Sequence, residues 1–377
     1  MVDLEKSREA LDKIDKQITE LMQERLEIVK DVAEYKQGTG KKVFDKKRED
    51  SKLEMVGSLA EDEFNRQSIE ELFRQIMSIG RKLQYGMIDT YEDTGLQCVP
   101  DLGVTKDTKV MYFGEPGSYT EQAMIEVFGE DVNASKGQEF QDVMQAVKEE
   151  RVDYGVLAIE NSSTGGITDN YDLFMKYDNT IVGEHVVKVE HALLGVKGAE
   201  LSDIKKVYSH PQGIHQCRTF LSEHPGMKTY EYFSTSAGAK KVADEGDKTQ
   251  AAIASKRAGI YYGLDVLAEA INFESENYTR FIIITNKRKY LKNANKISIS
   301  FELPHVAGSL YGILSHIRFN GLNMTKIESR PINGRNWEYR FFLDFEGNLD
   351  DAGVKNAMNG IREEAVNLRI LGNYCLL

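Results

Sequence analysis

The first ninety residues carry the apolar spacing of helices. Between residues 4 and 35, one row recurs at steps of three and four and is apolar except at Ser7 and Arg25: Leu4, Ser7, Leu11, Ile14, Ile18, Leu21, Arg25, Ile28, Val32 and Tyr35. This row predicts a long helix with a coiled-coil-like seam. A second helix is expected to begin at Asp45, whose carboxylate can cap it. A third is expected to carry these residues on one face: Ile69, Leu72, Phe73, Ile76 and Leu83. Residues 1–90 are therefore predicted to form an all-α, three-helix domain.

The pattern then changes to short apolar runs separated by polar strings. Residues 91–107 contain Asp-Thr-Gly and Pro-Asp clusters and read as a linker. Between residues 108 and 288, short segments expected to be strands, such as Val110–Phe113, Ile204–Tyr208 and Tyr230–Phe233, alternate with helical stretches. The unbroken run Tyr154–Ile159 is typical of a buried parallel strand. This alternation predicts a doubly wound α/β domain.

The last part of the chain has a third pattern. Lys296–Leu303 alternates as a strand does, and Gly308–Asn320 is expected to form a helix. A hairpin is expected around Asn333-Gly334, followed by a long helix and a strand over Leu368–Cys375. The order βαββαβ over residues 295–377 predicts an α+β ferredoxin-like sandwich.

Composition narrows the class of protein. A chain of 377 residues is long enough for two or three domains. The net charge is −12 and there is no long Lys/Arg block, which argues against a nucleic-acid partner. Cys98, Cys217 and Cys375 are far apart, without the spacing of a disulfide framework or a metal site, so we predict no metal and no cofactor. The first residues are charged, and about 18 consecutive apolar residues occur nowhere, so we expect a cytoplasmic protein without a membrane partner.

Polar residues interrupt the apolar faces of the predicted helices. Arg25 lies within the seam, where a guanidinium requires an anion. That anion is either a carboxylate of the protein or a ligand, and position in the seam alone favours the former. Gly80 and Gln84 interrupt the third helix one turn apart, which suits either a close helix contact or a ligand. Together Arg25, Gly80 and Gln84 predict a polar pocket between the helices. A domain this small is also expected to need a second copy of the chain to bury its long apolar seam.

In the central region, the polar strings follow the predicted strands. Such strings bring helix N-termini and hydroxyls around one crevice, which suits a small anion. Taken singly, each Ser or Thr reads as a helix cap, and His210 as a turn or core residue. No Ser-His-Asp spacing and no glycine-rich phosphate loop of the Walker or Rossmann type is present.

The helical domain resembles the all-helical class of chorismate mutases. The resemblance rests on the order and spacing of Arg8, Arg25, Lys36, Asp45, Arg48, Glu49 and Gln84. Gly80 departs from it, because the family often has serine there. The resemblance implies an interlocked dimer in which Arg8 reaches the partner's site. It also implies that Arg8 and Arg25, assisted by Arg48, hold the carboxylates of chorismate. Lys36 and Gln84 would then donate hydrogen bonds to the breaking ether, and Glu49 would hold a ring hydroxyl as prephenate forms.

The central domain resembles prephenate dehydratase. The matching positions are Ser118, Asn161, Ser162, Ser163, Thr164, Ser209, Gln212, Ser234, Thr235, Ser236, Thr279, Arg280 and Phe281. The resemblance implies two α/β lobes with the site between them and phenylpyruvate as the product. Thr279 is a poor acid and is expected to donate a hydrogen bond to the departing hydroxyl, with Arg280 as a carboxylate partner.

The C-terminal region resembles an ACT regulatory domain. The matching positions are Gly308, Ser309, Leu310 and Asn323, then Glu328, Ser329, Arg330 and Pro331. Ser309 and Tyr311 depart from the usual Gly-Ala-Leu-Val-like loop. The resemblance implies pairing with a second copy and phenylalanine bound at the interface.

Two hypotheses follow. The first is a bifunctional, homo-oligomeric enzyme that converts chorismate to prephenate and then to phenylpyruvate, restrained by phenylalanine. The second is a non-catalytic, amino-acid-responsive sensor with a helical dimerisation domain. Arg25, Lys36, Gln84 and Thr279 discriminate between them, because a sensor does not need donors aimed at breaking bonds.

Overall fold

The computed structural model describes residues 3–88, 94–332 and 334–377. The chain forms two compact units, Met1–Thr94 with Lys296–Ile370, and Gly95–Asn295 with Leu371–Leu377. The first unit therefore groups the predicted helical region with the predicted C-terminal region. Asn333 of the expected hairpin turn and residues 91–93 of the expected linker lie outside the described residues.

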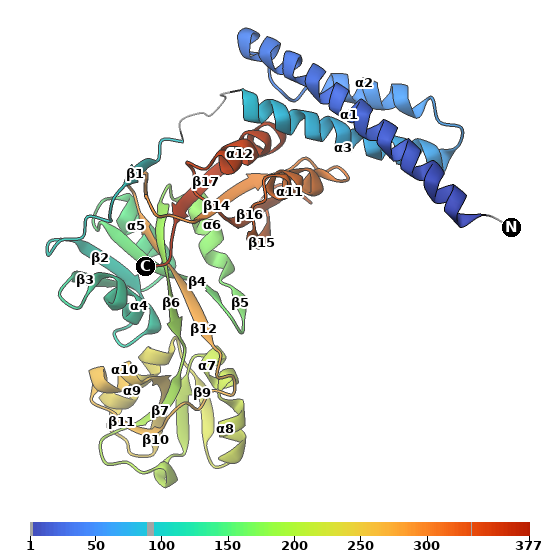
Figure 1. Ribbon diagram of the computed structural model, residues 1–377. Helices are drawn as coiled ribbons and strands as arrows, with labels where there is room; N and C mark the ends of the chain where they lie inside the picture. Colours follow the sequence, from blue (N-terminus) through green and yellow to red (C-terminus); the bar gives the residue numbers. More distant parts are fainter. Residues whose placement is uncertain (1–2, 89–93, 333) are drawn as a thin grey trace. The chain divides into compact units, whose positions relative to one another are not determined.

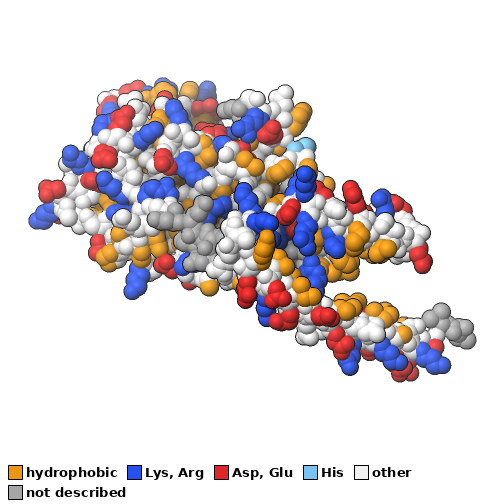
Figure 2. All heavy atoms as spheres, turned by 90° about the horizontal axis from the view of Figure 1, so that it is seen from above, with side chains coloured by type: hydrophobic (Ala, Val, Ile, Leu, Met, Phe, Trp, Pro, Cys, Tyr) orange, Lys and Arg blue, Asp and Glu red, His pale blue; other side chains and the backbone are white. Residues whose placement is uncertain are grey.

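Three helices open the first unit, α1 (Leu4–Thr39), α2 (Lys46–Gly57) and α3 (Glu63–Met87) (Figure 1). Asp45 caps α2 by accepting a hydrogen bond from the Arg48 backbone N–H, which confirms the predicted start of this helix. Much of the predicted seam is exposed in the single chain, and Leu21 retains 64% of its accessible surface. Figure 2 shows hydrophobic side chains in patches along the surface of this helical region.

The C-terminal part of the first unit follows the predicted βαββαβ order. Its elements are β14 (Lys296–Glu302), α11 (Ser309–Phe319), β15 (Met324–Pro331), β16 (Tyr339–Glu346), α12 (Ala352–Glu364) and β17 (Val366–Tyr374), and the end of β17 from Leu371 onward is grouped with the second unit. The strand order is β15-β16-β14-β17, and β16 runs antiparallel to both neighbours β14 and β15. β15 is thus an edge strand. Helix α12 contacts α3 through side-chain hydrogen bonds.

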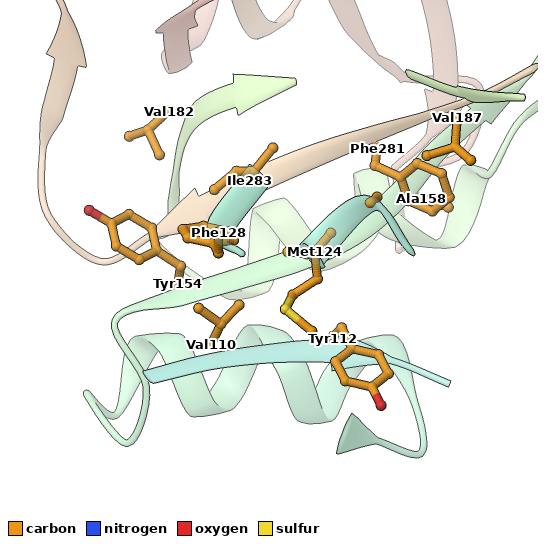
Figure 3. Packing of buried hydrophobic residues seen from close by; sticks show 12 residues of the cluster. Val110, Tyr112, Met124, Phe128, Tyr154, Ala158, Val182, Val187, Phe281 and Ile283 are labelled. Carbon is orange, nitrogen blue, oxygen red and sulfur yellow. The ribbon is translucent and has the colours of Figure 1, made fainter. Parts of the chain in front are cut away.

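The second unit contains a first lobe built on the sheet β6-β12-β4-β2-β3. Its elements are β2 (Lys109–Phe113), α4 (Tyr119–Phe128), β3 (Asn133–Gly137), α5 (Phe140–Lys148), β4 (Tyr154–Asn161), β5 (Gly165–Gly166), α6 (Thr168–Lys176), β6 (Thr180–Lys188) and β12 (Tyr278–Thr285). The short strands β1 (Gln97–Val99) and β13 (Lys289–Leu291) pair separately. Figure 3 shows side chains from α4, β2, β4 and β12 packed into one buried cluster.

The second lobe is built on the sheet β11-β7-β10-β8-β9. Its elements are β7 (His191–Gly195), the 3-10 helix η1 (Leu201–Asp203), β8 (Lys206–Ser209), α7 (Pro211–Gln216), α8 (Arg218–Glu223), β9 (Lys228–Glu231), α9 (Thr235–Glu245), β10 (Gln250–Ser255), α10 (Lys256–Tyr262) and β11 (Asp265–Ala268). The chain enters this lobe after β6 and returns to the first lobe at β12. The two-lobed α/β prediction is therefore confirmed.

Three finer predictions need correction. The sheets are mixed, because β12 pairs antiparallel with β4 and β6, and β10 pairs antiparallel with β7. The polar string after β4 contains a short strand that was not predicted, since β5 folds back and Gly165 pairs with Asn161. The strand expected to end at Phe233 ends at Glu231, because the chain there turns toward the cap of α9.

No helix among the described residues is long and apolar enough to cross a membrane. In the same residues, no group of three His, Cys, Asp or Glu side chains is arranged to hold a metal ion.

Candidate functional site

A cavity of about 460 Å³ lies between α1, the segment before α2, α2 and α3. Its walls include seven of the residues predicted from sequence: Arg25, Lys36, Asp45, Arg48, Glu49, Gly80 and Gln84. Arg8 does not line it, and lies exposed near the start of α1. One chain thus assembles the whole predicted set except the arginine that the resemblance assigns to a partner.

Arg25 and Lys36 line this cavity and bond directly only to backbone carbonyl groups among the described residues. Arg25 Nη1 donates to the Ile76 carbonyl at 3.4 Å, and Lys36 Nζ donates to the Val43 carbonyl at 2.7 Å. Within the described residues, neither cation forms an ion pair. Burial lowers the pKa of both groups, opposed by Glu49 at Arg25 and chiefly by Glu363 at Lys36. Partly buried cations whose nearby acids make no direct ion pair with them favour an anionic ligand over a structural carboxylate.

Gln84 and Gly80 line the α3 side of the cavity. Gln84 is buried, its Nε2 donates to the Gly80 carbonyl at 3.2 Å, and its Oε1 has no partner among the described residues. A Cβ at Gly80 would lie 3.3 Å from Arg25 Nη1. Glycine therefore leaves room for the Arg25 guanidinium, which gives a physical reason for the departure from serine.

Glu49 is held by an arginine that the sequence analysis did not single out. Arg81 Nη1 contacts Glu49 Oε2 at 2.6 Å, and Arg81 also lines the cavity. Its other partner, Glu364, is 283 residues away. The sequence shows an arginine next to Gly80, but it does not show that this arginine pairs with Glu49 and Glu364.

In the second unit, Asn161 and Thr279 face each other across β4 and β12. Asn161 Nδ2 donates to Thr279 Oγ1 at 3.0 Å and to Asn277 Oδ1 at 2.8 Å. Asn161 Oδ1 in turn accepts from the Ser163 hydroxyl at 2.7 Å and from Thr164 Oγ1 at 3.3 Å. Since the Thr279 oxygen accepts from Asn161, its own O–H proton is available to donate elsewhere.

The two lobes meet at this polar string. Gln212 Nε2 donates to Thr164 Oγ1 at 2.9 Å, and Gln216 Nε2 donates to Ser163 Oγ at 3.0 Å. Gln216 also contacts buried His191 at 2.9 Å. Burial lowers the pKa of His191, which favours the neutral ring. Gln216 was missed in the sequence, although it lies one helical turn after Gln212 on α7.

Other predicted residues of this unit have structural partners. Arg280 forms ion pairs with Glu160 at 3.1 Å and Glu184 at 3.0 Å, so the predicted carboxylate contact would require one acid to give way. Ser209 is fully buried and donates to the Ile253 carbonyl, and Phe281 belongs to the core cluster. Both side chains therefore have structural partners here, and their contact with a substrate stays a prediction.

The remaining hydroxyls lie at helix starts or turns. Ser118 caps α4, Ser234 caps α9, and Ser234 Oγ lies 3.4 Å from Ser236 Oγ, as the cap alternative expects. Ser162 bonds to the Glu276 carbonyl, and Thr235 is the first residue of α9.

In the C-terminal region, a cavity of about 350 Å³ lies beside the start of α11. Of the eight predicted phenylalanine contacts, only Ser309 lines it. Gly308, with a φ of 82°, precedes α11, and Leu310 lies in its first turn. Asn323 accepts through its backbone from Glu346 N–H, and Glu328, Ser329, Arg330 and Pro331 lie on the edge strand β15. A single chain therefore does not gather these eight residues around one cavity.

Comparison with known proteins identifies two family domains in the chain. The family model for chorismate mutase type II matches residues 7–85, and that for prephenate dehydratase matches residues 110–289. A bifunctional chorismate mutase/prephenate dehydratase of Aquifex aeolicus is 31% identical, over 99% of this chain and 98% of that protein.

The chain belongs to the bifunctional chorismate mutase/prephenate dehydratase family. It is accordingly an enzyme with both activities.

Solved structures match the part of this bifunctional enzyme that contains the dehydratase domain. A prephenate dehydratase from Arthrobacter aurescens, in complex with L-Phe, has a TM-score of 0.67 and 30% identity, covering 71% of this chain and 90% of that one. A protein described as a quorum-quenching acylase has a TM-score of 0.66 and 29% identity, covering 71% and 98%. Since the same fold is described with another activity, fold alone does not assign the chemistry.

Proposed function

We propose that the cavity between α1, α2 and α3 binds chorismate and rearranges it to prephenate. The observation that carries this is the convergence of Arg25, Lys36 and Gln84 on one cavity, with both cations outside ion pairs in the described chain. Arg25 holds a carboxylate, while Lys36 and Gln84 donate to the ether oxygen as negative charge develops there. The reaction needs no proton transfer, so orientation and fixed charge supply the catalysis.

The mutase site is completed by a second copy of the chain. The exposed apolar seam of α1 includes Leu11, Ile14, Ile18 and Leu21, each about half exposed or more. Such a row needs a partner, and pairing seam to seam is the simplest way to bury it. In this arrangement Arg8 of one α1 reaches the other chain's cavity, where Arg48 at the rim assists it.

The dehydratase site lies where Thr279 and Asn161 meet the second lobe. Asn161 fixes the Thr279 hydroxyl, whose proton points to the departing ring hydroxyl of prephenate. Loss of water and carbon dioxide then gives phenylpyruvate, driven by aromatisation. Because Arg280 is shared between two acids, the neutral polar groups of Ser163, Thr164 and Gln212 take a larger part in holding the substrate than the sequence suggested.

The C-terminal βαββαβ region acts as an ACT regulatory domain with a ferredoxin-like fold. Its strand β15 carries the Glu328–Pro331 motif and lies at the edge of the sheet, where a second copy of the chain could extend it. Phenylalanine binds where the two copies meet and restrains its own synthesis. Inhibition can be no larger than the preference of phenylalanine for the less active state. A cytoplasmic location stays a prediction.

One experiment tests the proposal as a whole. The purified protein is incubated with chorismate while chorismate loss and phenylpyruvate absorbance are followed, with and without phenylalanine. We expect phenylpyruvate to form and phenylalanine to slow its formation. Phenylalanine binding without turnover of chorismate or prephenate would support the sensor alternative instead.

A further inference from the structure

Arg81 joins the mutase cavity to the C-terminal region of the same unit. It is only 9% exposed, and its guanidinium is divided between two carboxylates. Nη1 contacts Glu49 Oε2 at 2.6 Å, while Nη2 and Nε contact Glu364 Oε1 at 3.0 and 3.1 Å. Glu49 lines the cavity, and Glu364 is the last residue of α12. One buried side chain therefore sets the position of a cavity residue against a helix of another region.

Glu364 is itself fixed from the far side. His316 on α11 is fully buried, and its Nε2 lies 3.0 Å from Glu364 Oε1. Burial alone would raise the pKa of Glu364, but His316 and Arg81 outweigh it and hold this pKa below its usual range. The carboxylate therefore stays charged. His316 lies in the last turn of α11, and the first turn of this helix adjoins Gly308, where we propose that phenylalanine binds. Helix α11 therefore connects the effector region to the series His316, Glu364, Arg81 and Glu49, which ends at the mutase cavity.

A second link runs through the neighbouring acid, Glu363. Its carboxylate accepts from the backbone N–H groups of Val43 at 3.1 Å and Phe44 at 2.6 Å, and from Tyr85 O–H at 2.9 Å. The Val43 carbonyl accepts from Lys36 Nζ at 2.7 Å. The end of α12 thus also holds the segment that positions Lys36.

These links are distinguishable from the rest of the interface. Lys82 Nζ donates to Ser315 Oγ at 3.0 Å, and Asn356 Nδ2 donates to the Lys82 carbonyl at 2.9 Å. Both contacts tie α3 to α11 or α12, yet Lys82, Ser315 and Asn356 do not line the cavity. The interface therefore contains two kinds of contact. The Lys82 contacts lie outside the cavity, whereas Glu363 and Glu364 bind groups that line it.

We propose that Arg81 is a positioning residue of the mutase site, held in place by Glu364, and that α12 thereby makes mutase turnover depend on the state of the phenylalanine-binding region. This inference rests on the proposed function of the cavity and of the C-terminal region. Arg81 acts through Glu49, which holds the ring hydroxyl of chorismate, and therefore sets the angle of the substrate to Lys36. Coupling of this kind is reciprocal, so a ligand in the cavity must alter phenylalanine affinity by the same factor.

The test compares two substitutions at one interface, in the full-length enzyme. Glu364→Gln keeps the shape of the side chain but removes its charge, whereas Ser315→Ala removes the Lys82 contact without touching the Arg81 series. We expect Glu364→Gln to lower mutase kcat by about tenfold with a smaller change in KM, because ground-state binding is kept and orientation is lost. Phenylalanine inhibition of the mutase should weaken in the same variant. Dehydratase turnover of supplied prephenate should be unchanged, which also shows that the variant is folded.

Equal mutase kcat and equal phenylalanine response in Glu364→Gln and Ser315→Ala would overturn the inference. If Glu364→Gln also loses dehydratase activity, misfolding would account for the loss, and the coupling is tested in the wild-type enzyme instead. Phenylalanine binding is then measured by calorimetry with and without a non-reacting bicyclic dicarboxylate that mimics the mutase transition state. We expect its dissociation constant to change about fivefold or more, and an unchanged constant would refute the coupling. An enzyme without mutase turnover in the wild type would instead refute the proposed function.

Discussion

The two proposed reaction sites of this chain differ in the kind of polar group that they present. The mutase cavity presents cations outside ion pairs among the described residues, Arg25 and Lys36, which burial keeps partly desolvated. At the dehydratase site, Arg280 is shared between Glu160 and Glu184, and the groups that converge are amides and hydroxyls. The difference follows the chemistry. A pericyclic step needs fixed charge at a breaking ether, while the dehydratase step needs a donor hydrogen-bonded to a departing hydroxyl.

The largest effect is expected at the mutase cavity. Lys36→Ala should lower mutase kcat/KM by about 10²–10³, or roughly 3–4 kcal/mol, because one preorganised donor to the developing charge is lost. Steady-state kinetics with chorismate measure it. Lys30→Ala is the control, since Lys30 lies on the same helix and pairs with Glu27 at 2.7 Å. A loss below about tenfold at Lys36, short of the range for such a donor, would remove it from the proposed mechanism.

At the dehydratase site, the prediction concerns the hydroxyl group of Thr279. Thr279→Val keeps the shape of the side chain and should lower turnover of prephenate by about 10², the lower end for a positioned proton donor. Thr279→Ser, which keeps the hydroxyl, should retain most activity. Mutase turnover should stay at the wild-type rate in both. If Thr279→Val retains most dehydratase activity, the donor role is wrong.

The pH dependence should also separate the two sites. Burial lowers the pKa of Lys36, and the protonated ammonium is the form that donates. Mutase kcat/KM should therefore fall as the pH rises through this lowered pKa, below the usual range for lysine. Dehydratase turnover should not share that limb, because Thr279 does not titrate there. A mutase profile that stays flat up to the normal lysine range would contradict the assignment.

The smallest effect is expected at Gly80. Substitution by alanine should raise the free energy of unfolding by up to about 1 kcal/mol, the usual gain over glycine inside a helix. The new Cβ would lie 3.3 Å from Arg25 Nη1, so we expect mutase turnover to fall a few-fold as the guanidinium shifts. Thermal unfolding and kinetics measure the two parts separately. Unchanged turnover would mean that Arg25 adjusts without cost.

Much of the mutase site could be predicted from sequence because helix caps and helix faces depend on residues that are near one another in the chain. Asp45 caps α2 as its residue type and position indicated. Arg25, Lys36, Gly80 and Gln84 reach one cavity because helical periodicity fixes which side chains share a face. The dehydratase site was predictable only in part, since Thr279 and Asn161 meet through a strand pairing between residues 118 positions apart.

Sequence alone determined the three kinds of region, their element order and the helix faces that carry polar groups, because periods of 3.6 and 2 and capping residues are local properties. Tertiary structure decided the rest. In the folded chain Arg280 is paired with acids and Ser209 is buried. The sheets contain both parallel and antiparallel strands, and Arg81 contacts Glu364, which is 283 residues away. The physical reason is that the charge state and reach of a side chain depend on which distant groups share its low-dielectric surroundings, and no local pattern records that.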